Sequence, residues 1–251
     1  MQELNLAFFA LAAPAVLFAG ISKGGFGSGA AFASASILAL VLEPGEALAI
    51  MLPLLMLIDL ATLGPYWAKW SWPDCRVLIL GGLPGVGVGA LLYRAADADV
   101  LRFLIGSISI AFVAWQMARR KGLIRVSRRE GGTAVGLFAG LVTGFTSFVS
   151  HAGGPPAAVY LLSRGLTKNQ FQATTVLVFW VINVAKFVPY AFLGMFTLQT
   201  ALADLLLAPV AVLGAWLGVR AHRVVSEQLF FGITYVLLAI TGSKLIFDAL
   251  T

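Results

Sequence analysis

Apolar segments, each about 20 residues long and so able to span a bilayer as a helix, follow one another along nearly the whole chain. Two of them are interrupted by glycine and hydroxyl residues, the first over residues 20–29 and the second over residues 140–156. Irregular backbone at membrane depth is tolerated only where it is buried in protein or lines a cavity. Matching breaks in the two halves of a chain are typical of the binding site of a transporter. The pattern therefore predicts a polytopic membrane protein with an internal site at the two breaks.

Composition excludes the main alternatives to a helical membrane protein. Only 11% of the 251 residues are charged, against roughly 25% in a soluble domain. A membrane barrel would need strands of about 10 residues with strict alternation, and the sequence shows none. We therefore expect an all-α chain without a separate soluble domain. The single cysteine, Cys75, excludes an internal disulfide and a thiolate metal cluster.

The apolar pattern predicts two equivalent sets of membrane segments. Each set has one broken stretch, which either crosses fully or is re-entrant, and three uninterrupted helices. The expected segments are a broken stretch over 4–42, helices over 46–64, 75–92 and 100–117, a second stretch over 132–163 broken near 143–155, and helices over 170–192, 200–219 and 228–249. The first segment begins without a positively charged region, so we interpret it as a retained membrane helix rather than a signal peptide.

The two sets match in sequence as well as in outline. Residues 59–66 align with residues 183–190 at a shift of 124, and both end in Pro-Tyr. Gly89 aligns with Gly214 in the same way. In the broken stretches we align Gly20 with Gly140, at a shift of 120. The chain is thus an internal repeat of roughly 120 residues.

The repeat and the charges together predict the topology. Residues 1–117 form the first repeat, residues 118–131 a basic linker and residues 132–251 the second repeat. The linker carries six basic residues and one acidic residue, which places it in the cytoplasm. The broken stretch returns the chain to the side where it began, and three helices follow, so each repeat starts and ends on opposite sides of the membrane. The two repeats are therefore inverted, and both termini lie outside. Twelve basic residues then fall on the linker side and three on the other, as the positive-inside rule requires. We interpret the net charge of +6 in this way and not as a nucleic-acid site.

The breaks combine groups that suit an anion. Half-helix N-termini carry partial positive charge and free N–H groups, glycine allows close approach to the backbone, and hydroxyls donate hydrogen bonds. The alternative for the glycines is tight helix packing. The candidate substrate-binding residues are Lys23, Gly24, Gly25, Gly27, Ser28, Gly29, Thr143, Ser147, Ser150, His151, Gly153, Gly154, Asn183 and Lys186.

Four ionisable residues fall in the membrane zone. Lys23 either neutralises the anion or snorkels to the surface. Lys186 lies in mid-helix, and Asp59 stands at the repeat equivalent of Asn183, so we predict that Asp59 and Lys186 are an ion pair or close neighbours. This pair is either structural, or Asp59 carries a coupling proton while Lys186 faces the substrate. His151 either binds the anion, relays a proton or packs as a hydrogen-bonded residue. Asp59 and His151 are the coupling candidates.

At these residues the chain resembles the sulfite exporter TauE/SafE family, also called the toluene sulfonate uptake permease family. The resemblance rests on Ala19-Gly20, the cluster over 24–29, the counterpart Gly140 to Pro156 and the two-repeat layout, and it covers essentially the whole length. It implies a multipass protein of a bacterial-type inner membrane that moves sulfite, sulfonates or other sulfur-containing anions. The second break reads His151 to Pro156 where the family commonly carries a Gly-x-Gly-Gly-Gly-like cluster, which leaves the substrate open.

We therefore predict an exporter of a small sulfur-containing anion that works by alternating access. A passive anion channel and a transporter of another small organic anion are the alternatives. A proton or sodium ion is the candidate coupling partner, and a homo-oligomer remains open. No enzyme activity, cofactor, metal or nucleic acid is expected, because no Gly-x-Ser-x-Gly elbow or His-x-x-x-His spacing accompanies Ser147, Ser150 and His151.

Overall fold

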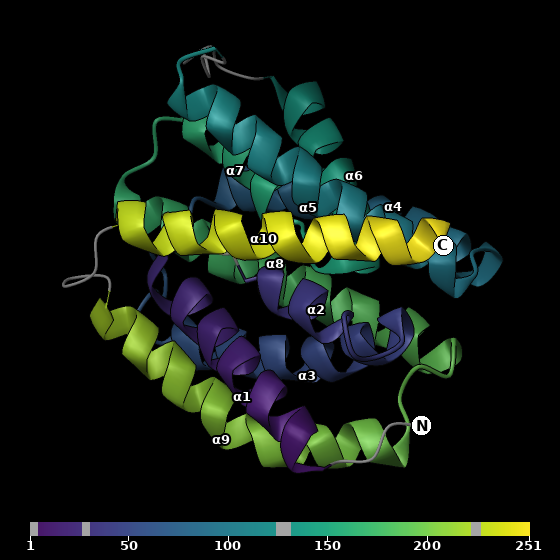
Figure 1. Ribbon diagram of the computed structural model, residues 1–251. Helices are drawn as coiled ribbons and strands as arrows, with labels where there is room; N and C mark the ends of the chain where they lie inside the picture. The colour runs from purple at the N-terminus through teal and green to yellow at the C-terminus, as the bar shows by residue number, and fades with distance from the viewer. Residues whose placement is uncertain (1–4, 27–30, 124–131, 222–226) are drawn as a thin grey trace.

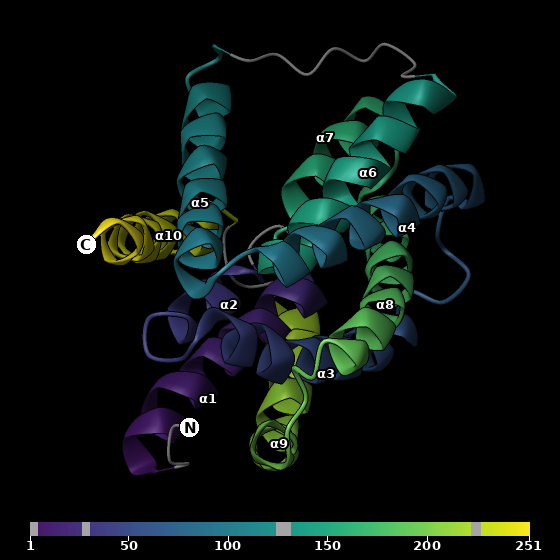
Figure 2. The same ribbon diagram turned by 90° about the vertical axis from the view of Figure 1, so that its right-hand side faces the viewer.

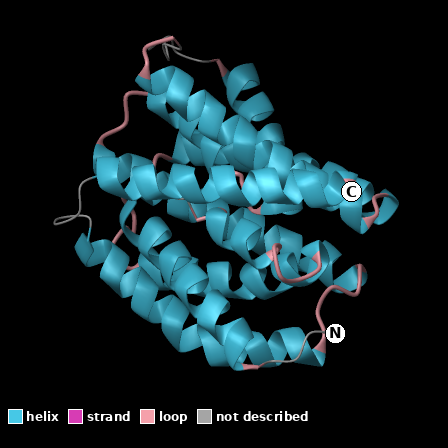
Figure 3. Cartoon of the chain, in the orientation of Figure 1, coloured by secondary structure: helices cyan, strands magenta, loops and turns pink. Residues whose placement is uncertain are grey.

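The computed structural model describes residues 5–26, 31–123, 132–221 and 227–251, and this part of the chain is helical without any strand (Figures 1 and 3). Eight helical segments of these residues are long and apolar enough to span a membrane, which confirms the expected all-α polytopic fold. The elements are α1 (Leu6–Ile21), the π-helical turn η1 (Ser22–Phe26), α2 (Ala33–Leu38), α3 (Pro44–Leu63), α4 (Trp72–Ala95), α5 (Ala98–Arg120), α6 (Thr133–Ser150), α7 (Gly154–Ser163), α8 (Lys168–Phe192), α9 (Leu198–Ala221) and α10 (Glu227–Leu250).

The two broken stretches are built differently. In the first, α1 continues into η1 and the short α2 follows. In the second, α6 runs without interruption to Ser150, so the expected break near residues 143–155 is confined to residues 151–153. Gly140 and Gly144 therefore lie inside a regular helix, and our placement of them in the break was wrong. Their small size serves packing, because both lie directly against the backbone of α4.

The first broken stretch returns the chain to the face where it began. Phe8 near the start of α1, Leu42 after α2 and Glu46 at the start of α3 border one surface hollow. Near the end of α10, Asp248 borders another hollow together with Leu42 and Glu46. Both ends of the described chain therefore lie on one face of the molecule, where the N and C labels stand in Figure 1. We call this the terminal face and the opposite side the linker face.

Corresponding helices of the two halves run in opposite directions. At the terminal face, one surface hollow is bordered by Pro44 at the start of α3 and by Leu193, which follows the end of α8. The same hollow is bordered by Ala96, which follows the end of α4, and by Thr197, which precedes α9. The inversion expected from the sequence is therefore present in the helix directions. Among the described residues, the basic side chains that we assigned to the two sides also lie at opposite ends of their helices. The assignment of the linker face to the cytoplasm remains a prediction.

The two halves exchange helices when they pack. α9 from the second half packs on α1 and α3, whereas α4 from the first half packs on α6 and α8. The result is two lobes, α1–α2–α3–α9 and α6–α7–α8–α4, with α5 and α10 crossing each other beside them (Figure 2). In Figure 2, α10 is seen nearly along its axis while α5 runs across the view. The sequence repeats thus do not fold as separate units, and their boundaries stay a prediction.

Glycine makes these exchanged contacts possible. A Cβ atom on Gly20 would lie 2.7 Å from the Cα atom of Gly214, and a Cβ atom on Gly140 would lie 3.0 Å from that of Gly81. Helices that approach this closely gain van der Waals contact along their backbones, which is a main source of helix association in lipid.

We expect Gly85→Val to destabilise the fold by about 1–3 kcal/mol, because overpacking forces a rigid interface apart. The added Cβ atom would lie 2.8 Å from the Phe145 nitrogen and closer still to the Leu141 carbonyl oxygen. Gly87→Val is the matched control, since no atom lies within 4 Å of a Cβ atom there. Thermal unfolding in detergent compares the two variants. Equal losses would show that the α4–α6 contact does not depend on glycine.

Candidate functional site

The broken helices, the last two turns of α3 and the second half of α8 enclose a buried polar cluster. Its members are Lys23, Asp59, Ser147, His151, Asn183 and Lys186, and none is more than 7% exposed. The cavity between them measures about 10 Å³, which is room for a single water at most. The sequence predicted all six residues as site or coupling candidates, and the structure brings them together.

Lys23 forms an ion pair with Asp59. The Lys23 Nζ atom lies 2.5 Å from the Asp59 Oδ1 atom, and the Asn183 side chain donates to the Asp59 Oδ2 atom over 2.8 Å. Lys23 is only 2% exposed, so the snorkelling alternative is wrong. Of the two alternatives predicted for Asp59 and Lys186, the ion pair is not formed among the described residues, because η1 places Lys23 at the carboxylate. The two residues are close neighbours, as the other alternative states, since their charges interact. Asp59 is thus held between both halves of the chain.

Lys186 has a different environment. Its ammonium group donates to the Ser147 carbonyl oxygen over 2.9 Å and to the His151 Nδ1 atom over 2.8 Å. The other ring nitrogen, Nε2, lies 3.1 Å from the Leu48 carbonyl oxygen. A carbonyl oxygen only accepts, so Nε2 carries the ring proton and Nδ1 accepts from Lys186. In the described part of the chain, Lys186 therefore has no carboxylate partner within ion-pair distance.

The backbone at His151 is unusual. Its φ of 55° places it in the left-handed region, where it caps α6. Glycine normally occupies such a cap, and a side chain there costs about 1–2 kcal/mol. A histidine held in this conformation indicates that its ring is needed between Lys186 and Leu48.

Two tyrosines hold the broken helices in place. Tyr66 donates to the Gly24 carbonyl oxygen over 3.2 Å, and Tyr190 donates to the Phe148 carbonyl oxygen over 2.7 Å. The two tyrosines are the ends of the aligned Pro-Tyr segments, so these contacts make Gly24 and Phe148 equivalent, at a shift of 124. Packing also argues against pairing Gly20 with Gly140, because Gly20 contacts Gly214 while Phe148, and not Gly140, contacts the aligned Gly89. The shift of 120 that we assigned to the broken stretches was therefore wrong.

Several predicted site residues lie outside the cluster. Gly24 and Gly25 pack on the backbone of α9, and the Ser150 hydroxyl donates to the Thr146 carbonyl oxygen. Thr143 is buried with its hydroxyl unpartnered among the described residues. Gly153 and Gly154 form the start of α7. Gly27, Ser28 and Gly29 lie outside the described residues.

The expected pair of half-helix N-termini is weakly developed. α2 has only six residues, and Pro155 and Pro156 in the first turn of α7 carry no N–H group. The first turn of α7 thus presents few backbone donors. The cationic character of the cluster comes from Lys23 and Lys186, which are side chains and not helix ends.

Gln172 is a contact residue that the sequence analysis missed. Its Nε2 atom donates to the Lys23 carbonyl oxygen over 2.7 Å, and its side chain is buried. A glutamine one turn into a predicted membrane span was the available signal.

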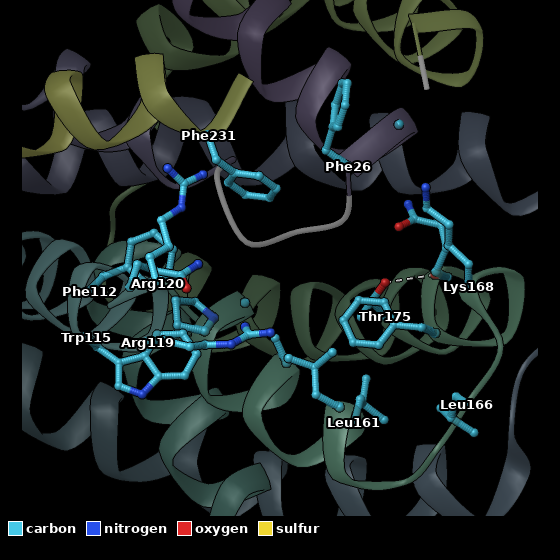
Figure 4. Close-up of a pocket in the computed structure, with 18 of the residues that line it drawn as sticks. Phe26, Phe112, Trp115, Arg119, Arg120, Leu161, Leu166, Lys168, Thr175 and Phe231 are labelled. Carbon is cyan, nitrogen blue, oxygen red and sulfur yellow. Dashed lines mark hydrogen bonds between the residues drawn. The ribbon is translucent and has the colours of Figure 1, made fainter. Parts of the chain in front are cut away.

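A large cavity opens on the linker face below the cluster (Figure 4). It measures about 590 Å³ and is bordered by Tyr66 and Gln172. These same side chains bond to the backbone of Gly24 and Lys23. One layer of residues therefore separates the open cavity from the buried ion pair.

We expect Lys23→Met or Asp59→Leu alone to destabilise the protein by about 3–5 kcal/mol, because each leaves a buried charge without its partner. The double variant should lose much less than the sum of the two. Unfolding in mixed micelles by SDS titration measures the three free energies, with the exposed Lys69→Met as the control. Additive losses would contradict the pairing.

Comparison with known proteins adds the family. The family described as sulfite exporter TauE/SafE matches residues 12–245, nearly the full chain. No curated protein and no solved structure matches the chain. Within the described residues, no group of three or more histidine, cysteine and acidic side chains is placed to hold a metal ion.

Proposed function

Because the chain belongs to the TauE/SafE sulfite exporter family, a family of membrane transporters, we propose that it carries sulfite or an organosulfonate across the inner membrane by alternating access. The observation that carries this proposal is the charge balance of the buried cluster. The cluster holds two ammonium groups, Lys23 and Lys186, but only one carboxylate, Asp59, which pairs with Lys23. An anion at the cluster would neutralise the excess positive charge, which is costly to bury alone.

The lysines and their neighbours suit an oxyanion of sulfur. Such an anion has several acceptor oxygens and needs charged and neutral donors around it. Lys186 would turn from the Ser147 carbonyl oxygen towards the anion, and Asn183 offers a neutral amide donor. His151 accepts a hydrogen bond from Lys186 and so holds its ammonium group in place.

The cavity sizes support alternating access over a passive channel. The cavity of about 10 Å³ at the cluster is too small for an anion with four or more heavy atoms. The cavity of about 590 Å³ approaches the cluster from the linker face, and one layer of residues separates the two. We interpret this arrangement as inward-facing, with the linker face in the cytoplasm, so an exported anion would enter from there. The inverted halves supply the alternative, outward-facing arrangement.

We expect Lys186→Met to reduce transport to background, because it removes the ammonium group that has no carboxylate partner in the described structure. The measurement is uptake by proteoliposomes of sulfite, thiosulfate, taurine, sulfoacetate and carboxylate analogues. Lys69→Met, at an exposed position, should transport as the unmodified protein does. Transport of carboxylates without sulfur anions would overturn the substrate assignment. Full activity of Lys186→Met would overturn the site, and flux without saturation would favour a channel.

We propose further that Asp59 carries the coupling proton. When an anion takes over Lys23, the carboxylate loses its ion pair and binds a proton more readily. Asp59→Asn should therefore flatten the pH dependence of transport, whereas Asp99→Asn at the exposed terminal face should not. Flux measured with and without an imposed pH gradient tests this. An unchanged pH profile in Asp59→Asn would remove Asp59 from the coupling.

A further inference from the structure

The linker-face cavity is lined by residues that do not belong to the buried cluster. Two consecutive arginines, Arg119 and Arg120, extend into it from the last turn of α5 (Figure 4). Aromatic rings of Phe26, Trp115, Phe231 and Tyr235 also border it. None of the described residues that line the cavity is acidic.

The arginines are oriented by aromatic rings and not by carboxylates. The Arg119 guanidinium lies 5.7 Å from the centroid of the Trp115 ring, and that of Arg120 lies 5.0 Å from the centroid of the Tyr235 ring. In the described part of the chain, no ion pair compensates either of them. A ring face attracts a cation but leaves the outward N–H groups available to an acceptor.

We propose that this cavity is a second binding site, for an organic anion with an aromatic or other apolar body. Arg119 and Arg120 bind the anionic group, since a guanidinium presents paired donors to carboxylate, sulfonate or phosphate oxygens. Phe26, Trp115 and Phe231 pack against the body. A volume of about 590 Å³ lies within the range of roughly 300–1,000 Å³ typical of small-molecule sites.

This site differs in chemistry from the buried cluster. The cluster has no room for an apolar body, whereas the cavity presents two guanidinium groups, with Lys168, beside aromatic rings. The occupant is a soluble organic anion, because the aromatic side chains line the interior of the cavity in Figure 4. An anionic lipid headgroup has the same charged chemistry and is one outcome of the test. Binding here does not depend on the transport proposal.

The test measures binding to the full chain in a neutral detergent by calorimetry. The probe is naphthalene-2-sulfonate, and methanesulfonate serves as the anion without a ring. We expect R119Q/R120Q to weaken naphthalene-2-sulfonate binding at least tenfold. The matched control is K69Q/R76Q, which removes two exposed basic residues near the same face that do not line the cavity. Its affinity should stay within twofold of the unmodified protein.

Two further variants separate this site from the buried cluster. Phe231→Leu should weaken binding of naphthalene-2-sulfonate several-fold and leave methanesulfonate unaffected. Lys186→Met should bind naphthalene-2-sulfonate normally even where its transport is lost. Loss of probe binding in Lys186→Met, or an equal loss in K69Q/R76Q, would overturn the proposal. So would complete displacement of the probe by phosphatidylglycerol with no displacement by other soluble organic anions, because the occupant would then be a lipid.

Discussion

The hydrocarbon core contains no water, so each polar group buried there must find its partner within the protein, and this requirement organises the molecule around Asp59. Its carboxylate holds Lys23 from the first broken helix and accepts from Asn183 of the other half. For these groups to meet, α3 and α8 must cross closely at mid-membrane. That crossing in turn requires the broken helices to pack closely against α9 and α4. The glycines of α6 and α9 allow this close packing, because they carry no side chain.

The exchanged helices explain which contacts would change in the proposed cycle. Lys23–Asp59 and Lys186–Ser147 each lie within one lobe. The bonds that cross between lobes are Asn183 to Asp59, Gln172 to Lys23 and His151 to Leu48. Among the described residues, rocking of the lobes would break only these hydrogen bonds. Each of them joins two neutral groups or one neutral and one charged group, so each lysine would keep a partner. A barrier built in this way stays low, because no unpaired charge is exposed to hydrocarbon on the way.

The sequence predicted the helices well because apolar length alone determines a membrane span, and it predicted the membership of the cluster because buried ionisable residues are rare there. It failed where tertiary packing decides. Gly140 and Gly144 have the composition of a break, yet contact with α4 keeps them helical. Lys186 aligns with a position one turn from Asp59, but the partner of Asp59 is Lys23, because η1 extends α1 by a turn. Neither the exchange of α4 and α9 nor this π-helical turn leaves a periodic signal.

The two lysines make the buried cluster unsymmetrical, although the chain is an inverted repeat. The first broken helix supplies a lysine that is already neutralised by Asp59, and the second supplies a histidine that leaves Lys186 uncompensated. An anion arriving from the linker face would first meet the side that holds Lys23, since Gln172 and Tyr66 border both the cavity and that segment. In the proposed cycle, neutralising Lys186 would then draw the anion deeper, whereas releasing Asp59 from Lys23 would require a proton. The order of binding would follow from position, and the coupling from the unequal charge of the two halves.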